Sequence, residues 1–286
     1  MTLLLREVVQ ALDALYPPDT AMSWDRVGLV AGDLDQPVSR IHFAVDPTVE
    51  VVQEAIAAGA DLLVTHHPLL LRGIHSVATT FAKGAAVTRA VVADLALYCA
   101  HTNADVADPG VSDALAAACG LVEVEPLGLD EGRPLGRLGR LDPPVSLRQF
   151  ASALAAALPA TAGGIRVAGD ADATVCRVAV LGGAGDDRFA DVRRVGADVY
   201  VTADLRHHPA LEAREEARVS GEGRPFLVDA GHWASESLWL PVAAAALRAR
   251  LGEAGTTVET WVSTLRTDPW DFTLGAHEAP DDGGAR

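Results

Sequence analysis

Short apolar runs that are typical of strands alternate with segments of helical periodicity along most of this chain. In the first half, apolar runs predict strands at 41–45, 61–65 and 95–100. Apolar residues that recur every three or four positions predict helices at 3–15, 48–58, 82–93 and 110–119. Because strands that alternate with helices pack as a sheet covered by helices, the pattern predicts an α/β fold.

The second half repeats this alternation after a change in composition. Residues 126–146 (PLGLDEGRPLGRLGRLDPPVS) are rich in Gly, Pro and Arg, which favours a lobe boundary, although LGRLGRL could itself contain a strand. We therefore expect a first lobe at 1–126, a second lobe at 127–274 and a disordered acidic tail at 275–286. The second lobe is expected to contain helices at 147–158, 189–195, 209–219 and 234–251 and strands at 175–181, 199–202, 225–229 and 257–262.

An internal repeat suggests that the two lobes are similar. The sequence GADLLVTHHP at 59–68 resembles GADVYVT at 196–202, which is followed by a second HHP at 207–209. Four additional residues separate this second histidine pair, His207 and His208, from its strand. We therefore expect His207 and His208 to be solvated or to face a substrate rather than to bind a metal.

Composition excludes several classes of function. Twenty-three Lys and Arg against thirty-nine Asp and Glu give a net charge of −16, which disfavours nonspecific binding to nucleic acid. Apolar runs fall well short of the roughly 20 residues of a membrane span, and Arg6 and Glu7 interrupt the N-terminal apolar segment. We therefore expect a cytoplasmic protein. Its three cysteines are widely spaced in apolar surroundings, which favours packing over disulfides or thiolate metal sites.

Ligand-type side chains follow three of the expected strands. In α/β sheets, functional sites are built at the carboxyl ends of strands. The residues in question are His66, His67, His101, Asp105, His232 and Glu236. Adjacent strand residues point to opposite faces, so His66 and His67 would serve two ions, or one ion and a substrate. His232 and Glu236 are four residues apart at the start of a helix, which places them on one helix face.

Each segment alone also has a purely structural interpretation. A loop histidine is usually solvated, Asp105 could help the loop enter the next helix, and Glu236 could favour the helix dipole. Together, however, the three segments supply imidazoles and carboxylates without a cysteine. This set suits Zn, Fe, Mn or Ni better than Ca or Mg.

Beyond these ligand types, the order of several segments resembles the Nif-three-like family, whose members are widely known as GTP cyclohydrolase 1 type 2 homologues. The segments that carry this resemblance are SWDRVGLVAGD, GADLLVTHHPLL, HTNADVADPGVSDALA, the GAGDD loop, GADVYVTADL and DAGHWASE. They cover nearly all of the chain except the tail. The resemblance implies two interlinked α/β lobes with a dinuclear metal centre in the cleft between them.

The resemblance also implies the roles of individual residues. The metal ligands would be His66, His67, Asp105, His232 and Glu236. His101 would have a catalytic role, facing the substrate or supporting a ligand rather than binding a metal. Of the carboxylates, we expect Asp105 to bridge both ions and Glu236 to be a terminal ligand. Arg26 and Ala203 depart from the family pattern, which usually has Asn and Gly there, and both departures concern the substrate side.

Two functional hypotheses follow from the residues and the resemblance. In the first, two divalent ions, with Zn, Fe or Mn preferred, support hydrolysis of a small molecule. The resemblance implies ring opening of the GTP cyclohydrolase type, and a nucleotide or phosphoester hydrolase would use the same centre. In the second, the protein is a non-enzymatic metal-binding or regulatory assembly. The resemblance further implies a homo-oligomer, specifically a hexameric ring with the metal sites facing an internal cavity.

Overall fold

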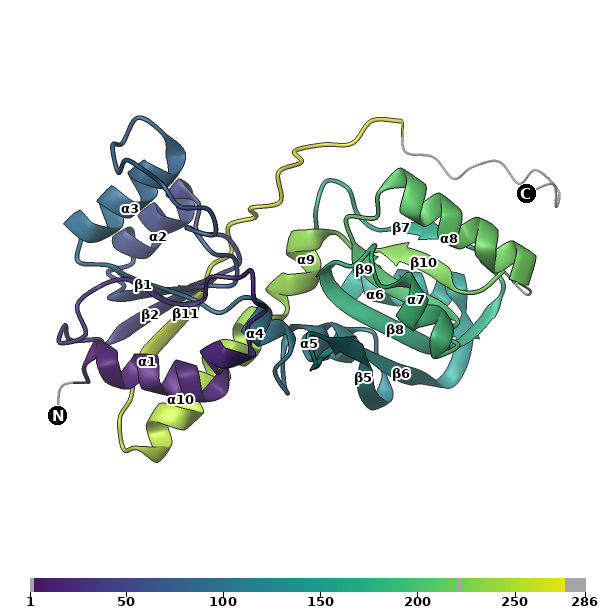
Figure 1. Ribbon diagram of the computed structural model, residues 1–286, viewed down its shortest axis with the longest axis horizontal. Helices are drawn as coiled ribbons and strands as arrows, with labels where there is room; N and C mark the ends of the chain where they lie inside the picture. The colour runs from purple at the N-terminus through teal and green to yellow at the C-terminus, as the bar shows by residue number, and fades with distance from the viewer. Residues whose placement is uncertain (1–2, 221–222, 276–286) are drawn as a thin grey trace.

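The computed structural model describes residues 3–220 and 223–275, which form two lobes with one β-sheet each (Figure 1). The strand order is β1-β4-β3-β2-β11 in the sheet of the first lobe and β5-β6-β8-β9-β10-β7 in the sheet of the second. Helices cover both sheets, so the predicted α/β class is confirmed.

The first lobe is a sheet between two helical layers. Its elements are α1 (Leu5–Leu15), the 3-10 helix η1 (Pro18–Thr20), β1 (Gly28–Ala31), β2 (Arg40–Ala44), α2 (Val49–Ala57), β3 (Leu62–Thr65), α3 (Ala82–Val92), β4 (Ala96–Cys99), α10 (Trp239–Glu253) and β11 (Glu259–Val262). Strands β4, β3, β2 and β11 are parallel, and β1 is antiparallel to β4. Helices α2 and α3 cover one face, and α1 and α10 cover the other (Figure 1). All four residues of β3 are therefore buried, as is typical of a parallel strand covered on both faces.

The second lobe has the same layered arrangement around a mixed sheet. Its elements are α5 (Val111–Ala118), β5 (Val122–Asp130), β6 (Arg133–Ser146), α6 (Leu147–Ala157), β7 (Arg166–Ala168), β8 (Thr174–Ala184), α7 (Phe189–Arg194), β9 (Val199–Ala203), α8 (His207–Ser220) and β10 (Phe226–Asp229). Strands β8, β9 and β10 are parallel. The antiparallel pairs are β5 with β6, β6 with β8, and β7 with β10. Between the lobes lie two short helices, α4 (Thr102–Asp105) and α9 (His232–Ser237) (Figure 1).

The C-terminal elements return to the first lobe. Strand β11 was expected in the second lobe with residues 127–274, but it pairs with β2 in the first sheet. Helix α10 packs against α1 in the same apolar core. The lobes are therefore interlinked, because the chain crosses between them more than once (Figure 1). The first crossing lies between α4 and α5, before the division expected near residue 126, because α5 and β5 pack in the second lobe.

Two further expectations differ from the structure. The Gly- and Pro-rich region 126–146 contains the end of β5 and all of β6, because these strands form a hairpin that also pairs with β8. The helix expected at 234–251 is two helices, α9 and α10, which meet at Leu238.

The expected disordered tail at 275–286 lies, from residue 276 onward, outside the described residues. Within the described ranges, each helix is too short or too polar to cross a bilayer.

Candidate metal centre

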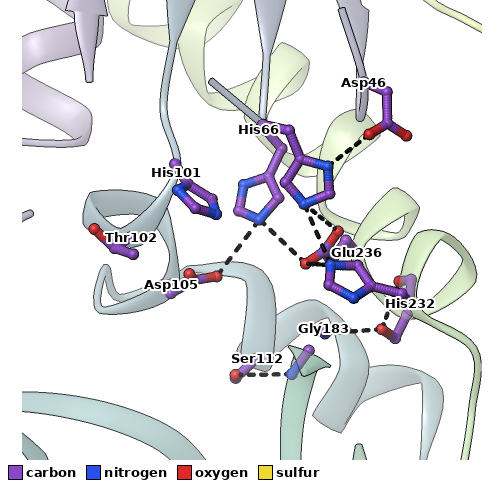
Figure 2. Close-up of polar contacts among 12 residues, drawn as sticks. Asp46, His66, His101, Thr102, Asp105, Ser112, Gly183, His232 and Glu236 are labelled. Atoms are coloured by element: carbon purple, nitrogen blue, oxygen red, sulfur yellow. Dashed lines mark hydrogen bonds and ion pairs between the residues drawn. The ribbon is translucent and has the colours of Figure 1, made fainter. Parts of the chain in front are cut away.

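The predicted site residues lie where the two lobes face each other. His66 and His67 follow β3, and His101 follows β4 and precedes α4, which ends at Asp105. His232 and Glu236 lie on α9, directly after β10. In Figure 2, the side chains of His66, His101, Asp105, His232 and Glu236 point toward one another, and His67 Nε2 lies 3.1 Å from Glu236 Oε2. The carboxyl ends of parallel strands from both sheets therefore build one site.

Glu236 lies at the centre of the cluster. Its carboxylate oxygens lie 3.5 Å from His66 Nε2, 3.1 Å from His67 Nε2 and 3.0 Å from His232 Nε2 (Figure 2). The Nε2 atoms of His67 and His232 lie 3.3 Å apart. Two imidazole nitrogens this close, both beside a carboxylate, require a shared proton or a shared cation between them.

Asp105 lies at the edge of the same cluster. Its Oδ1 lies 3.7 Å from His66 Nε2, and the carboxyl group is mostly buried. Of the two carboxylates, Glu236 thus approaches three imidazoles, whereas Asp105 approaches His66. Glu236 is therefore the more central of the two carboxylates, whereas the expectation from the sequence assigned the bridging position to Asp105.

Hydrogen bonds from outside fix the orientation of all four imidazoles. The Nδ1 atoms contact the oxygen acceptors Ala100 O (His66, 3.0 Å), Asp46 Oδ1 (His67, 2.7 Å), Asp25 Oδ1 (His101, 3.0 Å) and Asp204 Oδ2 (His232, 2.8 Å). Because these acceptors carry no proton when the carboxyls are ionised, each Nδ1 donates. With Nδ1 as the donor, Nε2 of each ring is the atom that binds a cation once it carries no proton, as is usual for metal-binding histidines.

Three of these acceptors, Asp25, Asp46 and Asp204, were not predicted from the sequence. Asp46 and Asp204 follow β2 and β9 within two residues, so the rule that pointed to His66 and His67 would also have found them. Asp25 lies in the loop before β1, and its buried carboxylate accepts hydrogen bonds from Thr102 N and Oγ1 at 3.0 and 2.5 Å. Burial opposes the ionisation of Asp25, but the hydrogen bonds from His101 and Thr102 outweigh it and lower its pKa.

The charges of the cluster are strongly coupled. Burial alone would lower the pKa of His67, but the carboxylates of Glu236 and Asp46 raise it to about 10. Burial would likewise lower the pKa of His232, but Asp204 and Glu236 raise it to about 11. Burial would raise the pKa of Glu236, yet the surrounding histidines lower it well below its ordinary value. For Asp105, burial dominates and raises the pKa to about 7. The cluster therefore favours bound positive charge.

The donor set fits metal ions. Two groups of side chains, His66–His67–His101 and His67–His232–Glu236, each bring one ligand atom per residue within 4.8 Å of one another. Among the described residues, His66 Nε2 is a buried polar atom without a hydrogen-bond partner, and the nearest carboxylate oxygens lie 3.5 and 3.7 Å from it. Buried polar atoms rarely lack a partner, so a ligand is expected at this point.

A glycine provides space beside the cluster. Gly183, in the GAGDD region at the end of β8, has a φ of +68°, which glycine adopts readily. A Cβ atom there would lie 2.3 Å from Glu236 Oε1 and 3.3 Å from His232 Nε2. The backbone N–H of Gly183 donates to Ser235 Oγ at 3.0 Å, which holds this loop against α9 (Figure 2).

Other residues singled out in the sequence lie outside the cluster. His207 and His208 are exposed at the start of α8, where their rings contact each other. Arg26 donates from its guanidinium to the backbone oxygen of Asp25, at 2.5 Å, and so lies close to the acceptor of His101. Ala203 is fully buried at the end of β9.

Comparison with known proteins identifies the family. The sequence matches the Duf34/NIF3 (NGG1p interacting factor 3) family over residues 3–269. The chain belongs to this family. A relative in Streptomyces coelicolor, named GTP cyclohydrolase 1 type 2 homolog, is 52% identical over 93% of each chain. A Mycobacterium bovis relative of the same name is 35% identical, over 95% of this chain and 98% of the relative. The resemblance inferred from the sequence is thus confirmed.

Solved structures of related proteins have the same fold. A Bacillus cereus protein related to NIF3 matches with a TM-score of 0.86 at 26% identity, over 96% of this chain and 100% of that chain. Reduced HcgD from Methanocaldococcus jannaschii matches with a TM-score of 0.74 at 27% identity, over 93% of this chain and 99% of that chain. The two-lobed α/β arrangement is therefore common to this chain and its structural relatives.

Proposed function

We propose that this protein is a metal-dependent hydrolase with a dinuclear centre that acts on a small molecule. One observation carries the proposal: four imidazoles, each oriented by an outer acceptor, converge with Glu236 and Asp105 around His66 Nε2, a buried atom without a hydrogen-bond partner among the described residues. Imidazole and carboxylate donors without thiolates favour Zn, Fe or Mn.

The geometry supports a division of the ligands between two ions. His67, His232 and Glu236 would hold one ion, and His66, His101 and Asp105 would hold the other, with Glu236 shared. We assign His101 to metal binding rather than to the catalytic role expected from the sequence, because Asp25 holds its Nδ1 and leaves Nε2 toward His66 and His67. Two ions at such a site would activate water and polarise the bond that is cleaved.

The surrounding residues would prepare this chemistry. Asp25, Asp46 and Asp204 hold the imidazoles in one tautomer, so the ligands need no rearrangement when an ion binds. The relatives' name, GTP cyclohydrolase 1 type 2 homolog, supports a small-molecule substrate such as a nucleotide. The homohexamer and the cytoplasmic location remain predictions from the sequence.

Metal analysis followed by a turnover assay tests this proposal. Protein purified without chelator should contain up to two ions of Zn, Fe or Mn per chain, and the His67→Ala variant should contain fewer. The metal-loaded protein should hydrolyse at least one member of a panel of nucleotides and phosphoesters, and the variant should not. Bound metal without turnover would favour the alternative, a non-enzymatic metal-binding assembly. Absence of bound metal would contradict both.

A further inference from the structure

A segment without helix or strand, residues 263–275, crosses from the first lobe to the second after β11 (Figure 1). We call this segment the strap. On the first lobe, Thr267 Oγ1 donates to Asp46 Oδ2 at 2.5 Å. On the second lobe, Thr273 Oγ1 donates to the backbone oxygen of Ala162 at 2.8 Å. Specific hydrogen bonds at both ends therefore fix the path of the strap.

The strap forms one wall of a pocket beside the metal-centre candidate. The pocket has a volume of about 580 Å³, and its lining includes His67 and His232 of the cluster. Residues 267–270 and Thr273 line it from the strap, and Thr161, Gly163 and Gly164 line it from the second lobe. This volume lies within the roughly 300–1,000 Å³ of pockets that hold small molecules. Asp46 links the strap to the cluster, because Oδ1 accepts from His67 and Oδ2 from Thr267.

The charge of this pocket limits what it can hold. Four carboxylates line it, those of Asp46, Asp204, Asp229 and Asp268. Among the described lining residues, Arg166 contributes a guanidinium group, which forms an ion pair with Asp229. Asp268 is likewise paired, with Arg266 at 3.4 Å. The ions of the proposed centre would compensate one anionic group of a ligand. Each further phosphate would instead face Asp46 and Asp204, which keep their negative charge when bound ions hold His67 and His232 in the neutral form, and repulsion in a partly buried pocket is costly.

The aromatic residues indicate the other part of the ligand. Trp233 and Trp270 both line the pocket, and Trp270 is 68% exposed. An indole face offers stacking area to a planar ring. The carboxylates and threonine hydroxyls nearby accept hydrogen bonds, so they suit a ring that carries N–H donors.

We propose that this pocket binds a small molecule with one anionic group and an uncharged planar ring that carries N–H donors, and that Trp270 contacts the ring. The inference rests on the proposed function, because the metal ions must hold the anionic group. It also narrows that function, because it disfavours a nucleoside triphosphate as the substrate in comparison with a monophosphate of the same ring.

Titration calorimetry on the full-length, metal-loaded protein tests the inference. The probes are the four ribonucleoside 5′-monophosphates, their triphosphates and inorganic phosphate, and metal content is measured after each titration to exclude extraction of the ions. At least one monophosphate should bind tenfold or more tightly than its triphosphate and than inorganic phosphate. Trp270→Ala should weaken binding of that monophosphate at least tenfold and leave binding of inorganic phosphate unchanged.

Phe272→Ala is the matched control. Phe272 lies on the same strap and is 74% exposed, but it does not belong to the pocket lining. Its replacement should leave the affinity for the monophosphate unchanged. Three outcomes would overturn the inference: tighter binding of the triphosphates, no binding of any monophosphate, or equal affinities of Trp270→Ala and the unsubstituted protein for the monophosphate. In each case, binding of inorganic phosphate would still support the proposed metal centre. Protein that binds neither metal nor inorganic phosphate would overturn the proposed function as well.

Discussion

At the scale of single residues, Glu236 is the group on which the proposed centre depends. Its carboxylate lies within 3.5 Å of three imidazole nitrogens, whereas Asp105 lies 3.7 Å from His66. We therefore expect Glu236→Gln to lose both ions, because each ion loses a charged ligand. Asp105→Asn should retain the ion held by His67 and His232. Metal content of the two purified, folded variants decides between them. Greater loss in Asp105→Asn would restore Asp105 as the bridge.

The coupled charges predict how the stability of the metal-free protein depends on pH. The pKa values of His67 and His232 are raised to about 10 and about 11. A histidine whose pKa is higher in the folded protein than in the unfolded chain stabilises the folded protein. This stabilisation is complete below the unfolded-chain pKa of 6.5, and it is lost as pH rises through the folded-state pKa. The free energy of unfolding should therefore fall, by on the order of a few kcal/mol, as pH rises from about 6.5 toward 10.

Urea unfolding of the metal-free protein at several pH values measures this dependence. A His67→Gln, His232→Gln double variant serves as the reference, because it lacks both titrating groups and keeps similar volume. The stability difference between the two proteins should shrink as pH rises. A constant difference, or one that grows with pH, would show that the two histidines are not protonated in the metal-free fold.

The sequence predicted most of the candidate site because its ligands directly follow strands. Its convergence could be predicted, since the carboxyl ends of parallel strands share one edge. Which of the two carboxylates, Glu236 or Asp105, lies closer to the imidazoles could not be predicted. It depends on how far α9 reaches from the second lobe toward His66 and His67. Asp25 could not be placed either, because its loop belongs to no repeating pattern, and a long-range contact with Thr102 holds it.

At the scale of elements, the junction of α9 and α10 packs against the cluster through Trp239, whose ring contacts that of His66. Trp239, the first residue of α10, is fully buried, with its ring 5.3 Å from that of Tyr16 and 5.5 Å from that of His66. Trp239→Ala should lower the free energy of unfolding by about 3–5 kcal/mol, because it leaves a cavity in the core. Urea denaturation of the two proteins measures the change.

The control for this variant is Trp261→Ala. Trp261 lies on β11 and is 42% exposed, so its replacement should change the free energy of unfolding by less than about 1 kcal/mol. Metal content should also fall in Trp239→Ala, since the ring of His66 loses its packing partner. Similar losses of stability in both variants would contradict the supporting role of the junction.

Periodicity located most elements, and it was least successful where pairing is long-range. Expected strand 61–65 corresponds to β3 at Leu62–Thr65, and expected helix 48–58 corresponds to α2 at Val49–Ala57. The hairpin of β5 and β6 was taken for a boundary, because Gly and Pro disfavour strands. Its turn, Glu131–Gly132, has positive φ at both residues, which is typical of two-residue hairpins and was the signal to use.

At the scale of the whole molecule, the proposed centre connects the two lobes. His66 and His67 come from the first lobe, and His232 and Glu236 come from α9 beside the second. Ions that bind only the folded arrangement stabilise it by about 4 kcal/mol at a thousandfold excess over Kd. For a chain of this size, chelation should therefore lower the melting temperature by about 8 °C or more.

Thermal unfolding with and without chelator measures this effect, and added Zn or Mn should restore the higher temperature. The Glu236→Gln variant should melt at the same temperature under all three conditions. A response of that variant as large as that of the unsubstituted protein would mean that the ions bind elsewhere.

The return of β11 and α10 to the first lobe also determines when that lobe can be completed on the ribosome. Leu5, Val8 and Leu12 of α1 share their core with Trp239 and Leu247, which are synthesised more than two hundred residues later. At roughly 5–20 residues per second, α1 is synthesised more than about 10 s before α10, its helical partner in this core. Strands β2, β3 and β4 can pack against α1 earlier, but the side of this core that α10 covers stays open for that interval, during which chaperones that bind apolar segments can engage it. A chain that terminates before α9 lacks His232 and Glu236 of the cluster and the part of the first-lobe core that α10 supplies.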